Sequence, residues 1–378
     1  KTGQSLDEVR DLLLAEVAKV RAGEFDEGLI KASINNYKMQ LMNEFDKYDQ
    51  RAMFYVYSFI YGKEWADDIK QLDRMEKITK QDVVDWANKF LGPESYAIVY
   101  KREGKDPNEQ KIAAPKITPI ATNRDAQSAF LAEIQGSEVK PIEPVFVDYA
   151  KDMAQFEARK GIEVLYKKNE SNDIFTLTYV FDTGTENDPA LNLAFDYLGY
   201  LGTDSLTAEQ IASKMYDIAC SFSMRAGANQ CSISITGLSE NMDEAMEIVG
   251  GLLTGAKPDE AILANLKTDM MKSRADAKLN QSRCFRALQQ YMLYGGDFIR
   301  RTTLTNPALE TTTSEALLAK IQDLLGKQHE VLYYGPQSEK EVTEALTAHH
   351  KTPAELQPLE KKHVQLLPTD ESRVLMAQ

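Results

Sequence analysis

The sequence predicts an α+β protein in which helices cover one face of an antiparallel sheet, and in which this domain type is repeated. Three observations support this prediction. Short β-rich segments occur in pairs, helical periodicities occur in runs, and one helix-turn-strand unit occurs twice in the chain. Strands in pairs and helices in runs are typical of α+β domains, whereas a parallel sheet requires the two to alternate.

The repeated unit spans residues 75–100 and 309–334, which align without a gap. In each copy a threonine is expected to cap a helix, and a glycine is expected to end it in the left-handed conformation. A β-rich tail then predicts a strand, at 96–100 and at 331–334. The matched threonines at the helix starts are Thr79 and Thr313, and the matched glycines at the helix ends are Gly92 and Gly326.

The similarity continues upstream at nearly the same spacing. Asp26-Glu27 matches Asp259-Glu260, and Tyr61-Gly62 matches Tyr294-Gly295. Three landmarks in one order predict two related domains. Chance similarity between two amphipathic helix-strand units is the alternative.

Taken in order, the first part of the chain is helical. Apolar residues at helical spacing predict a helix over 5–20 and a longer one from residue 26, and the aromatic run 53–61 continues as a buried helix. Residues 64–100 complete the first copy. Scattered prolines then indicate an extended linker over 101–148, with a short helix over 124–134.

The next domain alternates between strand pairs and helix runs. Strands 162–166 and 175–181 are expected to form an antiparallel pair around the turn 169–172, and strands 222–224 and 231–235 a second pair. The helical signals include the capping box of Thr207 with Gln210. The predicted helices cover 190–200, 207–218, 239–253, 258–277, 281–294 and 342–346, besides the one in the repeated unit.

The first copy lacks the strands that open the second domain, so we expect the chain to begin within a domain. The predicted division has four parts. They are 1–102, the C-terminal part of a first α+β domain; 103–150, a linker or hinge; 151–351, a complete α+β domain; and 352–378, a linker followed by first strands of another domain at 363–367 and 373–377.

Composition excludes several function classes. The formal charge of −14 argues against a nucleic-acid partner, because phosphate recognition uses clustered Lys and Arg. The three cysteines imply no disulfide framework. No apolar run approaches the length of about 20 residues that spans a bilayer, so no membrane partner is expected. The compartment is left open between a bacterial periplasm and a cytoplasm.

No catalytic constellation is visible in this chain. The four histidines are His329, His349, His350 and His363, and none is spaced for chelation. His329 is expected in a loop or at a sheet edge. Neither a CxxC pair nor a GxSxG elbow, P-loop or dinucleotide fingerprint occurs. We therefore expect no catalytic and no metal-binding residues in this chain.

The order of these elements resembles the pitrilysin/insulinase family of zinc metallopeptidases, relatives of the mitochondrial processing peptidase. The resemblance rests on Gly202-Thr203 after a helix, the strand pair 221–236, the turn Gly237-Leu238 and Pro258 before a long helix. It implies repeated domains of the LuxS/MPP-like metallohydrolase fold.

The family's active domain carries H-x-x-E-H just before the Gly-Thr pair, and its glutamate activates a zinc-bound water. Aligning Gly202-Thr203 with that pair puts Leu193, Asp196 and Tyr197 where His, Glu and His would stand. Leucine cannot bind zinc, so the domain resembles the family's inactive domains. Zinc is expected upstream, in the catalytic domain of a longer parent, and no cofactor is expected in this chain.

The resemblance implies a noncatalytic middle segment that forms part of the wall of a peptide-degrading chamber. Its partners would be a peptide or unfolded protein substrate and the parent's catalytic half. A peptide could be added as a strand to a sheet edge, but the sequence names no binding residues. The alternatives are an inactive scaffold or partner subunit of a processing-peptidase-like complex, and a helical adaptor, against which the strand pairs count.

Overall fold

The computed structural model describes residues 3–93, 95–102, 104, 112–120, 122–124, 126–359, 366–368, 371–372 and 374–376. Contacts divide the chain into two units. One unit joins residues 1–23 to 84–148, and the other joins residues 24–83 to 149–378.

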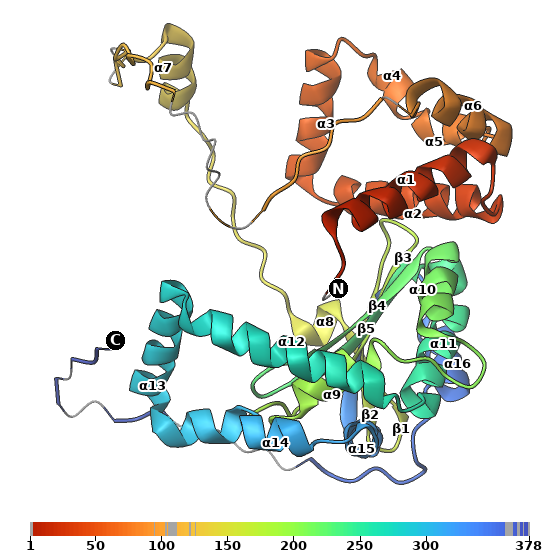
Figure 1. Ribbon diagram of the computed structural model, residues 1–378, viewed down its shortest axis with the longest axis vertical. Helices are drawn as coiled ribbons and strands as arrows, with labels where there is room; N and C mark the ends of the chain where they lie inside the picture. Colours follow the sequence, from red (N-terminus) through yellow and green to blue (C-terminus); the bar gives the residue numbers. More distant parts are fainter. Residues whose placement is uncertain are drawn as a thin grey trace. The chain divides into compact units, whose positions relative to one another are not determined.

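The larger unit is built on a six-stranded sheet with the order β1-β2-β6-β3-β5-β4 (Figure 1). Only β2 and β6 run parallel, and every other neighbouring pair is antiparallel. The strands are β1 (Ala154–Arg159), β2 (Ile162–Lys168), β3 (Ile174–Phe181), β4 (Cys220–Ala226), β5 (Cys231–Leu238) and β6 (His329–Gly335). The sheet is therefore mixed, with antiparallel pairing dominant.

The predicted direct pairing of strands 162–166 and 175–181 is wrong, because β6 lies between them. The turn that joins them is instead tied to the end of β6, where the Asn169 N–H donates to the Gly335 carbonyl at 2.8 Å. The predicted pair β4 and β5 is confirmed. Strand β1 was not predicted, since its sequence AQFEAR has no β-branched residue to signal it.

Helices cover one face of this sheet and enclose the core. α11 packs on β4 and β5, α9 and α10 pack on β4, and α15 packs on α9. Fully buried side chains from the sheet, such as Val164, Phe175 and Ile233, meet helix residues such as Leu198 and Leu317 there. The helices are α9 (Leu191–Leu198), α10 (Ala208–Asp217), α11 (Met242–Gly255), α15 (Ser314–Leu325) and α16 (Glu339–His349).

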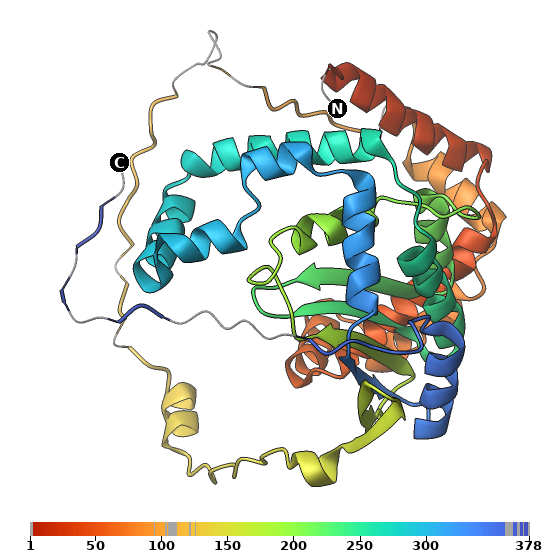
Figure 2. The ribbon, with the colours of Figure 1, turned by 90° about the horizontal axis from the view of Figure 1, so that it is seen from below.

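Three further helices form an arm beside the sheet (Figure 2). They are α12 (Glu260–Lys278), α13 (Gln281–Thr302) and α14 (Asn306–Thr311). The Asp259 carboxylate caps α12 by accepting from the N–H groups of Ala261 and Ile262. α13 is kinked at Gly295, which has φ 76° and ψ 175°. α15 leads from this arm back to the sheet.

The same unit contains four helices of the first copy: α2 (Gly28–Phe45), α3 (Tyr48–Ile60), α4 (Trp65–Asp68) and α5 (Gln71–Met75). α2 packs on α10. The Asn36 side-chain amide donates to the Tyr216 carbonyl at 2.7 Å, and the Ser33 and Tyr216 hydroxyls lie 3.0 Å apart. A 3-10 turn at Ser239–Asn241 precedes α11, and a short helix, α8 (Tyr149–Asp152), precedes β1.

Helix bounds in the two copies follow the alignment seen in the sequence. α2 corresponds to α12, α3 to the first part of α13, and α6 (Lys80–Phe90) to α15. The matched glycines Gly62 and Gly295 both have positive φ, 60° and 76°. The assignment of residues 1–102 to part of a first domain stays a prediction, as do the other domain boundaries.

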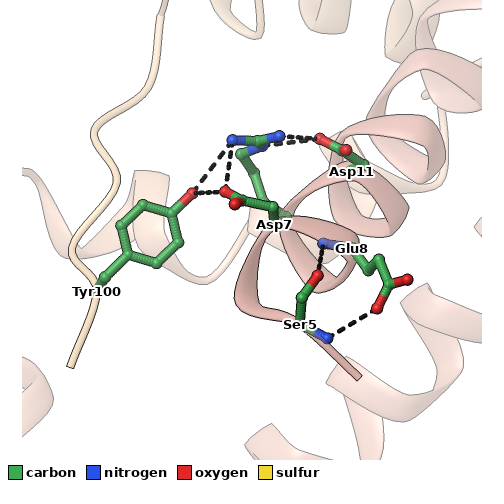
Figure 3. A network of polar contacts seen from close by, with 6 residues as sticks. Ser5, Asp7, Glu8, Asp11 and Tyr100 are labelled. Carbon is green, nitrogen blue, oxygen red and sulfur yellow. Dashed lines mark hydrogen bonds and ion pairs between the residues drawn. The ribbon is translucent and has the colours of Figure 1, made fainter. Parts of the chain in front are cut away.

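The smaller unit contains α1 (Leu6–Ala22), residues 84–90 of α6, and α7 (Ala129–Gly136) in the predicted linker. The Arg10 guanidinium donates to the Asp7 carboxylate at 2.9 Å and to the Tyr100 hydroxyl at 3.3 Å, and that hydroxyl donates to Asp7 at 2.9 Å (Figure 3). The predicted strand 96–100 is wrong, because these residues are not in a strand and Tyr100 bonds to a helix instead.

Two other local predictions need correction. Gly92 and Gly326 were expected to be left-handed, but neither has positive φ; Gly326 has φ −82°, and its N–H donates to the Gln322 and Asp323 carbonyls. Of the predicted strands at 363–367 and 373–377, only residues 366–367 and 374–376 lie among the described residues, and these are not in a strand.

Candidate functional site

The helix α9 holds the three residues that the resemblance aligned with a zinc motif. Leu193 and Tyr197 lie one helical turn apart on its buried face, with 2% and 0% of their surface exposed. Asp196 lies on the exposed face, where its carboxylate accepts from the Asn192 side-chain amide at 3.0 Å. Partial burial raises the pKa of Asp196. The three side chains therefore do not converge on one point.

Tyr197 fills a structural role in place of a ligand. Its hydroxyl accepts from the Asp259 N–H at 2.6 Å and donates to the Asp259 carbonyl at 3.2 Å, which ties α9 to the start of α12. Leu193 offers no donor atom and is packed in the core. These residues do not fit zinc, which needs three or more N, S or O ligands.

The prediction that His329 lies in a loop or at an edge is wrong. It is the first residue of the interior strand β6 and is buried. Its Nε2 lies 2.7 Å from Nε2 of His350, and its Nδ1 lies 2.7 Å from the Lys327 carbonyl. A carbonyl only accepts, so Nδ1 of His329 carries the proton and Nε2 accepts from His350.

Aromatic rings enclose this histidine pair. Tyr179 stacks on His350 at 4.0 Å between ring centroids, and Phe181 lies 4.6 Å from His329. Burial lowers the pKa of His329, and burial together with the neighbouring His329 lowers the pKa of His350 well below its usual range. The pair is neutral at pH 7 and joins β6 to the end of α16.

The buried pair His329 and His350 therefore contributes to packing. His349 lies 3.8 Å from the Asp243 carboxylate, and His363 lies outside the described residues. Within the described residues, no group of three or more His, Cys, Asp or Glu side chains could hold a metal ion.

The face of the sheet opposite the core carries hydroxyl groups. Alternation along β3, β4 and β5 places one set of side chains in the core and the other set on this second face. Cross-strand pairs link the hydroxyls: Thr176 with Thr236 at 3.0 Å and Thr178 with Ser234 at 2.9 Å. We call this surface the open face; its hydroxyl residues are Thr176, Thr178, Ser221, Ser223, Ser232, Ser234 and Thr236.

One end of the open face is hollowed and acidic. A cavity of about 610 Å³ lies where β1 and β3 end and β2 and β6 begin, and four carboxylates line it. Lys160 is a cation in the same lining. The excess of negative charge favours a cationic group of a bound chain. The carboxylates belong to Glu157, Glu163, Asp182 and Glu330.

The sheet has two edge strands, β1 and β4, among the described residues. β1 has a register shift between Glu157 and Arg159, and the Arg159 side chain bonds to the Pro353 carbonyl. β4 pairs with β5 in unbroken register from Cys220 to Ala226. A bulge and charged side chains discourage strand addition, so β4 is the better edge for a peptide.

Sequence reasoning missed the open face and both edges. The alternating serines of β4 and β5 were a usable signal, since Ser at every second position marks the solvent side of a strand. Which strand forms an edge depends on the insertion of β6, which no local pattern indicates.

No protein-family model and no curated protein matches this sequence. Solved structures do. A crystal structure of a peptidase M16 inactive domain from Pseudomonas fluorescens matches with a TM-score of 0.50 and 16% identity, over 56% of this chain and 53% of that chain. The fold is that of peptidase M16 domains.

The periplasmic protease PqqL from Escherichia coli also matches, with a TM-score of 0.51 and 14% identity. It covers 97% of this chain, which spans only 43% of PqqL. Thus the chain spans about half of each solved protein or less, and these identities support the fold alone. None of the helices among the described residues is long and apolar enough to cross a membrane.

Proposed function

We propose that this chain is a noncatalytic segment of a zinc metallopeptidase of the pitrilysin/insulinase type, and that it forms part of the wall of a peptide-degrading chamber. The zinc site is in a preceding catalytic domain of the same parent. The observation that carries the proposal is α9, where Leu193 is packed in the core and Tyr197 bonds to Asp259 at the positions aligned with the zinc motif.

The open face would supply the surface of that wall. Its hydroxyls can exchange hydrogen bonds with an extended peptide without selecting a particular side chain. Beside them, β4 presents an edge of regular register to which a strand can be added. The acidic hollow at the far end would take lysine or arginine side chains of the substrate. This arrangement suits an unfolded chain of varied sequence.

The test compares the parent protein with this chain alone. We expect the parent to bind zinc and to cleave a quenched unfolded peptide, and a chelator to abolish cleavage, while this chain alone neither binds zinc nor cleaves. Zinc-dependent cleavage by this chain alone would show that the alignment of Leu193, Asp196 and Tyr197 is wrong.

A matched pair of substitutions in the parent tests the wall itself. Ser223→Arg places a large cation on the open face, and Ser213→Arg places the same side chain on the exposed surface of α10. We expect Ser223→Arg to raise KM for the peptide about fivefold or more, a loss of about 1 kcal/mol in binding, and Ser213→Arg to leave it unchanged. Equal KM values for the two variants would remove the open face from the substrate path.

A parent that lacks both zinc and cleavage would instead support the alternative, an inactive scaffold or partner subunit of a processing-peptidase-like complex. The two predicted compartments, bacterial periplasm and cytoplasm, are distinguished by cell fractionation with an antibody to this chain.

A further inference from the structure

A second hollow lies within the helices of the first copy. It has a volume of about 470 Å³ and is enclosed by α2, α3, α4 and α5. Most of its lining is aromatic or aliphatic, which is the usual composition of a site for an apolar ligand. We call it the aromatic pocket; the aromatic residues are Phe45, Phe54, Tyr57, Tyr61 and Trp65.

Ring contacts give the aromatic pocket a defined wall. Phe45 of α2 stacks on Phe54 of α3, with ring centroids 4.8 Å apart. The edge of Trp65, from α4, lies against Phe45 at 6.2 Å, and Tyr55 packs on Trp65 at 4.6 Å. Contacts between rings from three helices fix the wall before any ligand binds.

The fold does not require all of these aromatic residues. The second copy has the same helices and keeps an aromatic residue at the positions matched to Tyr61 and Trp65, but the positions matched to Phe45, Phe54 and Tyr57 hold polar or small residues. These counterparts are Lys278, Ala287 and Gln290. Because the same helix arrangement forms without three of the five rings, the addition of these three rings in the first copy points to a ligand.

The polar groups of the lining indicate the charge of that ligand. Asp68 already accepts from the Ser58 hydroxyl at 2.6 Å and lies 3.9 Å from the Lys63 ammonium. Lys38, on α2, also lines the pocket, and its ammonium has no partner among the described residues. Among the described residues of the lining, Lys38 is thus a cation without a partner beside an apolar wall, which favours an anionic group on an apolar ligand.

We propose that the aromatic pocket binds the C-terminal residue of a peptide, with a large apolar side chain against the rings and the α-carboxylate at Lys38. The exposed tyrosines Tyr57 and Tyr61 line the same pocket, and their hydroxyls can bond to the amides that precede that residue. An alkyl acid has no amides for these hydroxyls. This inference extends the proposed function, but its test requires no peptidase activity.

The test uses the fluorescence of Trp65. The chain has two tryptophans, Trp65 and Trp86, so the Trp86→Phe variant reports the pocket alone. The probe is acetyl-Ala-Ala-Phe with a free carboxylate, compared with its C-terminal amide, with acetyl-Ala-Ala-Ala and with dodecanoate. We expect a saturable change of emission with the free acid, binding about tenfold weaker for the amide, and no change with the alanine peptide.

Matched lysine variants test the carboxylate contact. Lys38→Gln removes the cation at the pocket, and Lys31→Gln removes an exposed cation from the same helix outside the lining. We expect Lys38→Gln to abolish the preference for the free acid over the amide, and Lys31→Gln to preserve it, with far-UV circular dichroism unchanged in both.

Several outcomes would overturn the proposal. They are the absence of a saturable signal with the phenylalanine peptide, equal binding of acid and amide, an unchanged preference in Lys38→Gln, and tighter binding of dodecanoate than of the peptide. The last outcome would identify an alkyl acid as the ligand. Each of these results leaves the wall role of the open face standing, because that role is measured by cleavage in the parent.

Discussion

The two copies of the helix-turn-strand unit have the same local structure and different surroundings. α6 and α15 begin at matched threonines and occupy matched positions. In α15, Leu317 and Leu324 are buried in the core, whereas their counterparts in α6, Val83 and Phe90, are partly exposed, Phe90 by 50%. The second copy continues into β6, and the first copy continues into residues 95–100, which form no strand.

The difference separates local from nonlocal causes. A helix forms from its own caps and periodicity, so it forms in both copies. A strand needs neighbours: Val331 and Tyr333 form a strand because β2 lies on one side and β3 on the other. The same β-rich signal at 96–100 has no such partners among the described residues and gives no strand.

Truncation of a matched core position should give the largest contrast. Leu324→Ala in α15 is expected to cost about 2–5 kcal/mol, and Phe90→Ala, its counterpart in α6, about 1 kcal/mol, because Phe90 is half exposed. The loss of stability in Leu324→Ala is measured by the rate at which Cys231 is labelled. Burial raises the pKa of this thiol to about 12, so labelling requires the sheet to open. A Cys220→Ser, Cys284→Ser background removes the other thiols.

Equal costs in both copies would break the comparison and would mean that α6 packs as tightly as α15. Unfolding of the Phe90→Ala variant is followed by the emission of Trp86 in a Trp65→Phe background.

The matched glycines should give the next largest effect. Gly295→Ala and Gly62→Ala each force a side chain into positive φ, which is expected to cost about 1–3 kcal/mol. Gly295 should cost more, because ψ 175° lies in a region reserved for glycine and an added Cβ would lie 3.2 Å from a Leu367 methyl. An added Cβ at Gly62 meets nothing within 4 Å. Thermal unfolding followed by circular dichroism measures both, and a neutral Gly62→Ala would contradict its left-handed geometry.

Acidification should destabilise the second copy selectively. The folded His329–His350 pair has lowered pKa values, so the unfolded chain binds more protons just below pH 6.5. Stability is then full above that pH and falls as pH drops from 7 to 5, by up to about 1.4 kcal/mol per pH unit for each proton taken up. Urea midpoints over this range measure it.

His350→Phe should reduce that dependence to the part that His329 contributes, while the stacking on Tyr179 is kept, and His349→Gln, outside the pair, should preserve it. A pH dependence as steep in His350→Phe as in the unsubstituted chain would assign the effect to other groups. No histidine lies in the first copy, so its unfolding should not change over the same range.

The matched caps should give the smallest effect, and an equal one. Thr313 accepts from the Ala316 N–H at 3.2 Å, and Thr79 accepts from the Asp82 N–H at 3.2 Å. Thr→Ala at either position is expected to cost about 1 kcal/mol, because a cap is a local contact. Melting of each helix region is compared in the two variants, and a cost confined to Thr313 would show that surroundings govern even the caps.

The fold could be predicted as far as local signals reach. The capping box of Thr207 with Gln210 and the strand pair of β4 and β5 are present as the sequence indicates. The insertion of β6 between β2 and β3 could not be predicted, since direct pairing of β2 with β3 and pairing of each with β6 bury the same apolar face. For the same reason the edge strands and the open face required the structure.

The candidate site divides in the same way. The alignment of Leu193 and Tyr197 with a zinc motif argued against metal from the residues alone, and the structure adds that Tyr197 is bonded to Asp259. The burial of His329 depended on its neighbour His350, which is distant in the sequence. The prediction that the aromatic run 53–61 is a buried helix is wrong, because most of its large side chains are exposed and part of the run lines the aromatic pocket.

The position of β6 has a consequence for the order of folding. Within the described part of the chain, β6 is the strand that joins the pair β1–β2 to the group β3–β5–β4 by backbone pairing. Five α-helices separate β6 from β5 in the sequence, so β6 is synthesised last. Until then the inner edges of β2 and β3 are unpaired. Pairing over so long a loop is slow, and exposed edges attract other chains. Nascent chains of this protein should therefore depend on chaperones until β6 has left the ribosome.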